Sequence, residues 1–267
     1  MILRRPAILF SATLVFLLMS CSEYQKLLKS ENYELKYEKA VEYYEDEDYY
    51  KAKNLFNELK NIYKGTERAE KIYYHYAYCL YMEGELALAA YHFRQFAKTY
   101  PNSEFTQDAE FRTALCFYDL SPDPSLDQAF TKRGIDAFQA FLNKYPKTEY
   151  KDTVNTLVDK LHHKLETKSY NNAYLYYKIK DYKAAITALQ NSIDNYPGSP
   201  YNEDARFYML KSWYLYADGS VRKKQAERFE ETLTAYHKLI DNYHDTEYID
   251  EANKIKEKVK EKVKLIN

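Results

Sequence analysis

The chain has very little glycine, proline or tryptophan: 5 Gly, 7 Pro and 1 Trp among 267 residues. So few turn-forming residues argue against sheet-rich folds and against glycine-rich phosphate-binding loops. An excess of one charge is lacking too, because Lys and Arg almost balance Asp and Glu and the net charge is −1. Nucleic-acid binding requires a clustered basic surface. We therefore expect no nucleic acid among the partners.

The motifs that mark common catalytic sites are also missing. The sequence contains no HExxH, GxSxG, GxGxxG or P-loop motif. Six histidines are scattered along it. The adjacent pair His162 and His163 would point about 100° apart on a helix, so they cannot share one face. We expect no enzymatic activity, no catalytic residue, no metal site and no cofactor.

Cysteine is rare, with three residues in the chain. Cys79 and Cys116 both lie within apolar helical patterns. A disulfide between them is possible in an oxidising compartment, but a free Cys is commonly a small buried hydrophobe. We expect buried thiols and leave the pairing open.

The first residues, MILRRPAILFSATLVFLLMSC, have the layout of a signal peptide. Arg4 and Arg5 precede an apolar run over residues 7–19. That run is too short for a comfortable transmembrane helix. Residues 1–20 are therefore predicted to be a signal peptide, and residues 21–32 a short tether before the fold begins.

The end of this segment, Leu18–Cys21, resembles the bacterial lipoprotein signal. The resemblance implies cleavage after Ser20 and acylation of Cys21. Several acyl chains together make a stable membrane anchor. In lipoproteins of this kind an Asp after the acceptor Cys favours the inner membrane, so Ser22 favours the outer membrane. An ordinary secretory signal or an uncleaved anchor is the alternative.

What the chain does contain is a repeated phrase: KTYPNSEF at 98–105, NKYPKTEY at 143–150, DNYPGSPY at 194–201 and, without proline, DNYHDTEY at 241–248. Proline cannot continue a helix. A Ser or Thr follows three residues after the Tyr and is an N-cap candidate for the next helix. An aromatic residue follows after five. Each copy predicts helix, stop, cap and helix, and such units stack into a solenoid.

Small and large apolar residues recur in register within these units. Three sets share their spacing: Ala40, Tyr43, Ala52 and Phe56; Ala77, Leu80, Gly84, Ala89, Phe93 and Pro101; and Ala173, Tyr176, Tyr182, Ala185, Leu189 and Pro197. The sets resemble the tetratricopeptide repeat. The predicted fold class is an all-α tetratricopeptide-repeat solenoid of about five helix-turn-helix repeats with a C-terminal capping helix.

Two insertions and one long helix interrupt the regular spacing of the repeats. Residues 120–128, LSPDPSLDQ, predict an inserted loop, and residues 217–224, ADGSVRKK, a similar insertion. No Gly or Pro lies between Lys147 and Ile179, which predicts one long helix. We expect an N-terminal half over 33–146 with repeats 1–3, a C-terminal half over 147–246 with repeats 4–5, and a capping helix over 247–267.

Tyrosine is abundant, with 31 residues. In tetratricopeptide repeats the first helix of each unit lines the concave face. Its exposed positions fall three before, one after and four after the small residue. Tyr offers a large apolar face and a polar tip, which suits an extended peptide. The predicted peptide groove comprises Tyr37, Tyr44, Tyr74, Tyr78, Tyr81, Phe111 and Tyr118. The alternative is that these rings pack between helices.

The order of these features resembles the BamD family, lipoprotein subunits of the outer-membrane β-barrel assembly machinery. The resemblance rests on the lipoprotein start, the junction TYPNSEFTQDA, the long helix and the stretch NAYLYYKIKDYKAAITALQNSIDNYPGSPYNEDA. It implies a scaffold, lipid-anchored at the periplasmic face of the outer membrane. Repeats 1–3 would bind targeting signals of unfolded outer-membrane proteins. Repeats 4–5 would dock on POTRA domains of an Omp85-type barrel subunit.

Docking-region candidates are Arg206, Lys211, Trp213 and Arg222, chosen because they lie in repeat 5. Two other functions stay open at this point. One is another periplasmic repeat adaptor lipoprotein, acting in the cell envelope or in division. The other is a glycan-binding lipoprotein of the SusD type, although the large inserted loops of an aromatic sugar platform are absent.

Overall fold

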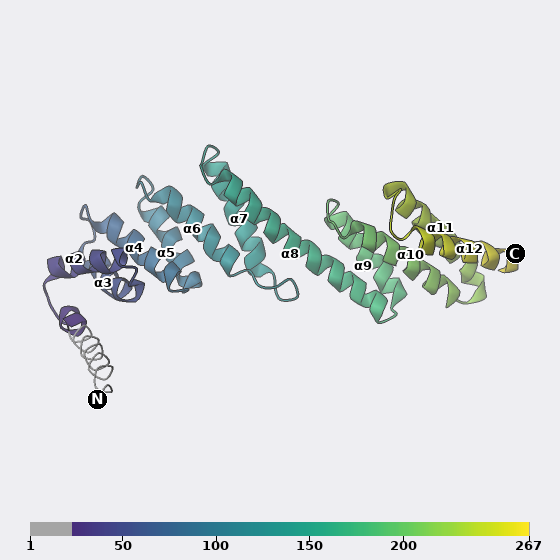
Figure 1. Ribbon diagram of the computed structural model, residues 1–267, viewed down its shortest axis with the longest axis horizontal. Coiled ribbons are helices and arrows are strands. Elements are labelled where there is room, and N and C mark those ends of the chain that lie inside the picture. Colours follow the sequence, from purple (N-terminus) through teal and green to yellow (C-terminus); the bar gives the residue numbers. More distant parts are fainter. Residues whose placement is uncertain (1–22, 267) are drawn as a thin grey trace, which may run out of the picture. The chain divides into compact units, whose positions relative to one another are not determined.

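The computed structural model describes residues 23–266, and every regular element in this range is a helix (Figure 1). The predicted all-α class is confirmed. The expected signal peptide and Cys21 lie outside the described residues. No helix within 23–266 is both long enough and apolar enough to cross a membrane. Two compact units divide the chain: described residues up to Ser121 together with Ala129–Val154, and Pro122–Gln128 together with residues from Asn155 onward.

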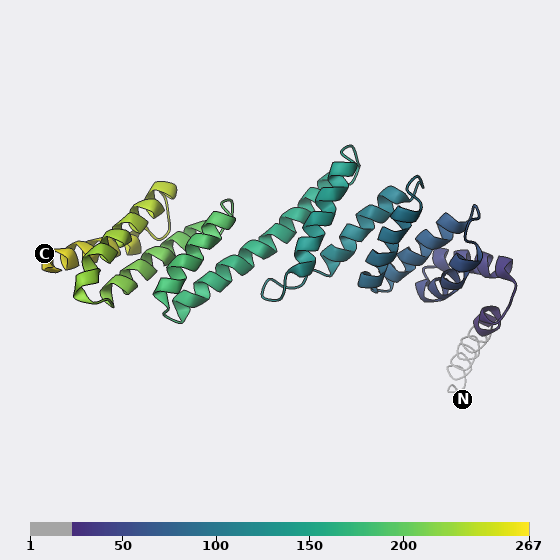
Figure 2. The ribbon, with the colours of Figure 1, turned by 180° about the vertical axis from the view of Figure 1, so that it is seen from behind.

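The first unit is a series of helices in which each packs against the next (Figures 1 and 2). Residues 23–28 are helical and are followed by α2 (Tyr33–Glu45), α3 (Tyr49–Ile62), α4 (Ala69–Met82), α5 (Leu86–Thr99), α6 (Thr106–Asp119) and α7 (Ala129–Lys144). Large apolar side chains at helical spacing close its core, among them Phe56, Phe93 and Phe96, which have no exposed surface.

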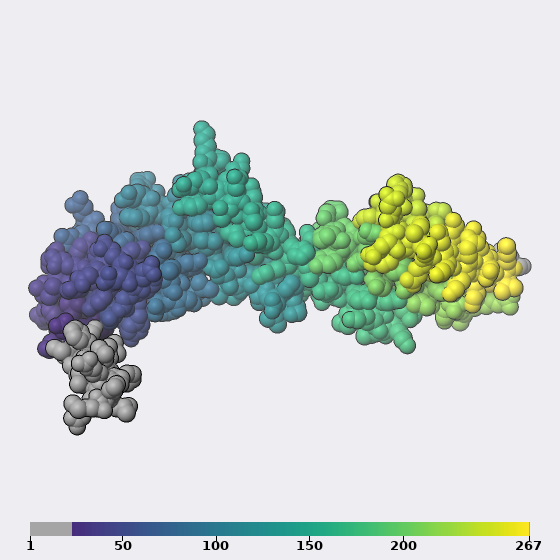
Figure 3. Space-filling view, in the orientation of Figure 1, coloured from purple at the N-terminus to yellow at the C-terminus, as the bar shows by residue number. Residues whose placement is uncertain are grey.

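The second unit contains most of the long helix expected between Lys147 and Ile179, which is α8 (Lys151–Lys178). It continues with α9 (Tyr182–Asn195), α10 (Asn202–Asp218), α11 (Arg222–Asn242) and α12 (Ile249–Ile266). The terminal helix α12 packs on α10 and α11, and both α11 and α12 lie on the face shown in Figure 3. Helix α12 buries Ala252, Ile255 and Val259. A terminal helix of this kind covers the apolar face of the last repeat of a solenoid.

The two predicted insertions take different forms. Residues 121–128 form turns and irregular backbone, as expected of the loop. The insertion near residues 217–224 does not make a loop. It lengthens both flanking helices, so that α10 has 17 residues and α11 has 21, whereas α9 has 14. The predicted insertion is therefore present as added helical length, with α10 ending at Asp218 and only residues 219–221 between it and α11.

In three helix pairs, the tight turn between the two helices contains a residue with a left-handed backbone conformation. Glu47, Gly84 and Lys180 have φ of 59°, 76° and 65°, and each lies seven residues after the small residue of its repeat. Asp48 and Asp181 follow two of them as N-caps, and their carboxylates accept the backbone N–H of Lys51 and Ala184.

At the junctions between helix pairs, the Ser or Thr predicted to be an N-cap instead forms a short turn with its own side chain. The hydroxyls of Ser103, Thr148, Ser199 and Thr246 accept the N–H of the residue two positions on, at 3.2–3.3 Å. Helix α6 starts at Thr106, three residues after Ser103. The hydroxyl therefore stabilises the bend before the helix, while the aromatic residue occupies the cap position.

The N-terminal segment expected to be a tether belongs in part to the fold. Tyr24 and Leu27 are buried in the core of the first unit. Lys36 is a buried residue, 1% exposed, and its ammonium donates to the Leu28 carbonyl at 3.0 Å and to the Glu58 carboxylate at 2.7 Å. Residues 23–28 are thus held by apolar packing and by a buried cation.

Both remaining cysteines are buried free thiols. Burial raises the pKa of Cys79 and of Cys116 to about 12. The expectation of buried thiols is confirmed.

Candidate functional site

Two residues of the predicted groove are not exposed. Tyr74 and Phe111 are buried, with 7% and 6% of their surface exposed. Tyr74 stacks on Phe105 with 4.6 Å between ring centroids, and Phe111 stacks on Tyr150 with 4.2 Å. These two rings therefore join consecutive repeats and do not line an open surface, which corrects their predicted exposure.

The same stack recurs along the chain. Its partners are the aromatic residue three before the small residue of one repeat and the aromatic residue of the next junction: Tyr74–Phe105, Phe111–Tyr150, Tyr170–Tyr201 and Phe207–Tyr248. At the first junction Arg68 replaces the second ring and lies 4.6 Å from the centroid of Tyr37. Both positions were recognised in the sequence, but their pairing across the junction was missed.

A contiguous aromatic surface remains on the first unit. We call Tyr44, Tyr49, Tyr78, Tyr81 and Arg112 the aromatic face. Ring centroids are 5.5 Å apart for Tyr44 and Tyr78, and 5.9 Å for Tyr44 and Tyr49. The Arg112 guanidinium lies 4.4 Å from the centroid of Tyr78 and 6.0 Å from that of Tyr81. All five side chains are partly exposed.

A network of polar side chains holds Arg112 of the aromatic face in place. The Asp108 carboxylate accepts Arg112 Nε at 2.5 Å, the Tyr74 hydroxyl, and the Tyr150 hydroxyl at 3.4 Å. Asp108 and Arg112 are one helical turn apart on α6, so their pairing needs little extra ordering. On the neighbouring helix, the Tyr81 hydroxyl donates to Asp119 at 2.9 Å.

A buried histidine supports the other side of the aromatic face. His75 is 8% exposed and stacks on Tyr44 with 4.1 Å between ring centroids and 5° between planes. Burial, and then the charge of Lys71, lower the pKa of His75 to about 4. Its Nδ1 has no hydrogen-bond partner within the described structure. His75 is therefore a neutral packing residue near pH 7.

The other predicted groove residues lie apart from this cluster. Tyr37 packs against Tyr63 and Arg68. Tyr118 is half-buried near the end of α6. The structure thus brings together Tyr44, Tyr78 and Tyr81 of the predicted set, and it adds Tyr49 and Arg112, which no repeat position had indicated.

The four docking candidates do not form one surface. Lys211 and Trp213 are two residues apart on α10, so they point about 200° apart. Lys211 pairs with Glu251 of α12 at 2.7 Å and lies near the rings of Tyr177, Phe207 and Tyr208.

The remaining two candidates also separate. Arg222 is exposed and donates to the Leu265 carbonyl at 3.3 Å. Arg206 is partly buried, and its Nε has no hydrogen-bond partner among the described residues. Neither is in contact with Lys211 or Trp213 through a described interaction.

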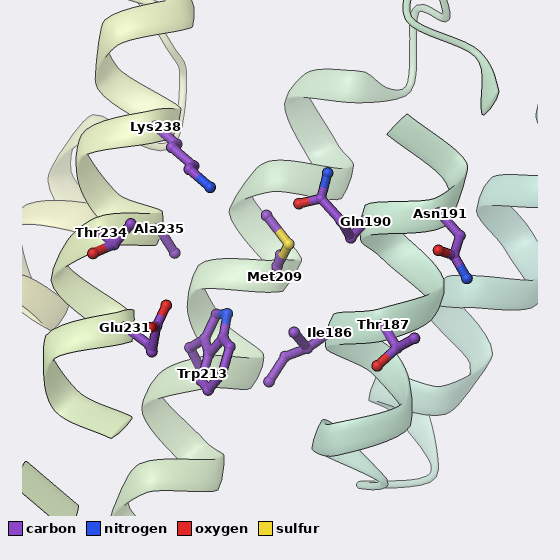
Figure 4. Close-up of a pocket in the computed structure, with 10 residues that line it drawn as sticks. All are labelled: Ile186, Thr187, Gln190, Asn191, Met209, Trp213, Glu231, Thr234, Ala235 and Lys238. Atoms are coloured by element: carbon purple, nitrogen blue, oxygen red, sulfur yellow. The ribbon is translucent and has the colours of Figure 1, made fainter. Parts of the chain in front are cut away.

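Trp213 lines a groove of about 310 Å³ between α9, α10 and α11. In Figure 4 its ring lies beside Met209 and opposite Ile186 of α9, with Glu231 and Lys238 of α11 at the rim. Trp213 is thus half-buried beside Met and Ile side chains and remains accessible from the groove.

No cluster of His, Cys, Asp or Glu between residues 23 and 266 could hold a metal ion.

A family described as "YfiO: Outer membrane lipoprotein" matches residues 31–171 and 163–264. Two similar proteins are both described as outer membrane protein assembly factor BamD. That of Rickettsia prowazekii is 25% identical over 167 residues, 62% of this chain and 66% of the relative. That of Caulobacter vibrioides is 23% identical over 214 residues, 78% and 70% of the two chains.

Solved structures that match this chain include tetratricopeptide-repeat proteins. One is a repeat protein from Parabacteroides merdae, 13% identical, with a TM-score of 0.36 over 86% of this chain and 79% of the other. Another is the TPR2AB domain of yeast Sti1, 12% identical, with a TM-score of 0.41 over 85% and 98%.

Proposed function

This chain belongs to the YfiO family of outer membrane lipoproteins, and on that premise we propose that it is an assembly factor for outer-membrane proteins. The proposal is carried by the family match, which extends over both units, from residue 31 to residue 264. In this role the protein is a scaffold without catalysis. It is held at the periplasmic face of the outer membrane by acyl chains on Cys21.

The aromatic face of the first unit is the proposed site for unfolded outer-membrane proteins. Tyr rings lose little conformational entropy on binding and present both an apolar face and a hydroxyl. The packing of Tyr44 on His75 and of Tyr78 on Arg112 holds these rings in place before a ligand arrives. Preorganisation of this kind favours binding of a flexible segment, which itself loses entropy.

The second unit is the proposed docking site for POTRA domains of an Omp85-type barrel subunit. Its groove around Trp213 offers an apolar floor and a rim of both charges, Glu231 and Lys238. A half-buried aromatic ring with a polar rim is compatible with a specific interface, whose core is apolar and whose rim is polar.

A pull-down from detergent-solubilised membranes tests the function. Tagged full-length chain should recover an Omp85-type barrel subunit, and Trp213→Ala should reduce that recovery at least several-fold. Tyr176→Ala is the matched control, because Tyr176 is a 42% exposed aromatic residue of the same unit. Recovery of other envelope partners without any barrel subunit would overturn the proposal in favour of a different adaptor.

Peptide binding tests the first unit separately. Tyr78→Ala should weaken the binding of peptides from outer-membrane proteins about tenfold, which corresponds to about 1.4 kcal/mol. Tyr91→Ala should leave it unchanged, since Tyr91 is 47% exposed on α5 and outside the aromatic face. Tyr74→Ala is a poor choice, because Tyr74 is buried and its loss would damage the repeat junction. Equal affinity for Tyr78→Ala and the unmodified protein would contradict the assignment.

A further inference from the structure

A separate groove lies on the first unit, away from the aromatic face. It has a volume of about 400 Å³ and is enclosed by α5, α6 and α7, and α6 packs on both of the other helices. Helix α6 contributes Glu110 and Thr113 to the lining. Glu110 and Asp108 are two residues apart on this helix, so they point about 200° apart. The groove therefore opens on the side of α6 nearly opposite to the polar network that holds Arg112.

The interior of this groove is lined by short apolar side chains. Ala97 of α5 and Ala137 and Ala140 of α7 line it together with Phe141. Phe141 is 2% exposed and belongs to the core, whereas Ala140 is exposed. Alanine side chains let another helix approach closely, and packed helices lie about 8–10 Å apart. The groove thus has room for the apolar face of a helix, which is a common way of binding a partner segment.

The rim of the groove is positively charged. Arg94 and Lys98 are exposed and one helical turn apart on α5, and neither has an ion pair within residues 23–266. The third cation of the lining, Lys144, pairs with Glu110 at 2.6 Å. The carboxylate in the lining is therefore already neutralised, and two positive charges remain beside an apolar interior.

The groove around Trp213 in the second unit differs in its charge. It occupies the corresponding place between two second helices, α9 and α11, with α10 between them. Its rim carries Glu231 and Lys238, so the two signs balance. The stacking of helix pairs thus produces a groove in both units, whereas the positive rim is particular to the first unit.

We propose that the groove of α5, α6 and α7 binds an amphipathic helix of a partner protein, in which acidic side chains flank the apolar stripe. The stripe covers Ala137, Ala140 and Phe141, and the carboxylates beside it pair with Arg94 and Lys98. This partner site goes beyond the proposed function and does not depend on it, because neither the aromatic face nor the second unit takes part.

Two labelled peptides test the preference for an acidic helix. Both carry the same Leu stripe at helical spacing, and the flanking positions are Glu in one and Lys in the other. Binding is measured by fluorescence anisotropy on the full-length protein, and a titration with detergent alone corrects for binding to micelles. We expect at least tenfold tighter binding of the Glu peptide, because the rim attracts one peptide and repels the other. The difference should shrink as salt is added, since exposed charges are screened.

A variant that fills the groove ties this binding to its place. Ala140→Phe adds a ring at an exposed position of the lining and should weaken binding of the Glu peptide at least tenfold. Gln139→Phe is the matched control, because Gln139 is the exposed neighbour on α7 and does not line the groove. It should bind the peptide as the unmodified protein does.

Reversing the rim charges tests the other half of the site. Arg94→Glu combined with Lys98→Glu should make the Lys peptide the tighter ligand. Lys132→Glu, an exposed position of α7 outside the groove, should leave the preference for the Glu peptide as it was. The comparison of the two peptides on the unmodified protein does not require any variant to fold.

Each contrary result overturns the proposal. Equal affinity for the two peptides, tighter binding of the Lys peptide or no binding of either contradicts an acidic partner helix. Full binding by Ala140→Phe, or a preference that survives the double charge reversal, places the helix elsewhere on the protein. None of these results changes the expected outcome of the pull-down, so the proposed function stands or falls separately.

Discussion

Phe111 and Tyr150 lie face to face, with 4.2 Å between ring centroids and 3° between ring planes. The pair joins a first helix of one repeat to the beginning of the helix that follows the next junction. The same relationship recurs in Tyr170–Tyr201 and Phe207–Tyr248, where the planes differ by 7°. Two aromatic residues thus join the helices at four junctions, and Arg68 takes the place of the second ring at the first one.

Removing one ring of this pair should destabilise the first unit. Phe111→Ala deletes a ring that is 6% exposed and should cost about 3–5 kcal/mol in the free energy of unfolding. Tyr150→Phe keeps the ring, and it should cost little because the bond from its hydroxyl to Asp108 is long, 3.4 Å. Denaturant unfolding of both variants checks this. A cost below 1 kcal/mol for Phe111→Ala would show that the stack contributes little.

Glycine at Lys180 should stabilise the second unit. Lys180 has φ of 65°, a conformation that costs an L-residue about 1 kcal/mol and glycine almost nothing. Lys180→Gly should raise the free energy of unfolding by about 0.5 kcal/mol, once the greater freedom of glycine in the unfolded chain is subtracted. Gly84→Ala, at the equivalent turn with φ of 76°, should lower it. Thermal unfolding curves of the two variants should shift in opposite directions.

Acid should weaken the first unit through His75. Its pKa is about 4 in the fold because of burial and then the Lys71 charge, against about 6.5 in an unfolded chain. Between these values the unfolded state binds more protons, so stability falls as pH falls from about 6.5 to 4, by up to 1.4 kcal/mol per pH unit. His75→Phe should be less sensitive to pH than the unmodified protein in that window. Parallel stability curves for the two proteins would contradict this role.

The ion pair between buried Lys36 and partly exposed Glu58 should respond asymmetrically to mutation. Glu58→Gln leaves the Lys36 ammonium, 2% exposed at the side chain, without its carboxylate, and should cost about 3 kcal/mol. Lys36→Met removes the buried cation and fills its volume, so it should cost less. Comparing the two midpoints of urea unfolding tests the difference. A larger loss for Lys36→Met would mean that its bond to the Leu28 carbonyl dominates.

Much of this architecture follows from patterns along the chain. The absence of Gly and Pro between Lys147 and Ile179 predicts α8 almost to its ends, because a helix continues where nothing stops it. The apolar spacing of Ile255 and Val259 predicts the cap. The separation of Lys211 and Trp213 could also have been foreseen, since two residues on a helix lie on nearly opposite sides.

Other features depend on contacts between distant segments. That Tyr74 meets Phe105 and is buried requires knowing which helices are neighbours. Arg112 occupies no recognised repeat position, so only its place beside Tyr78 makes it part of the candidate site. The left-handed turn at Lys180 lacks the glycine that marks the same turn at Gly84, and sequence alone indicates only the second.

The packing of Tyr24 and Leu27 into the first unit has a consequence for the proposed membrane anchor. With Cys21 acylated, as we propose, only Ser22 lies between the acylated residue and the first described helical residue, Glu23, and an extended chain covers at most about 7 Å from Cys21 to Glu23. So short a connection would hold the first unit close to the membrane. Under the proposed function, unfolded outer-membrane proteins would then meet the aromatic face at the inner surface of the outer membrane, and a flexible insert after Ser22 would place that face at a variable height.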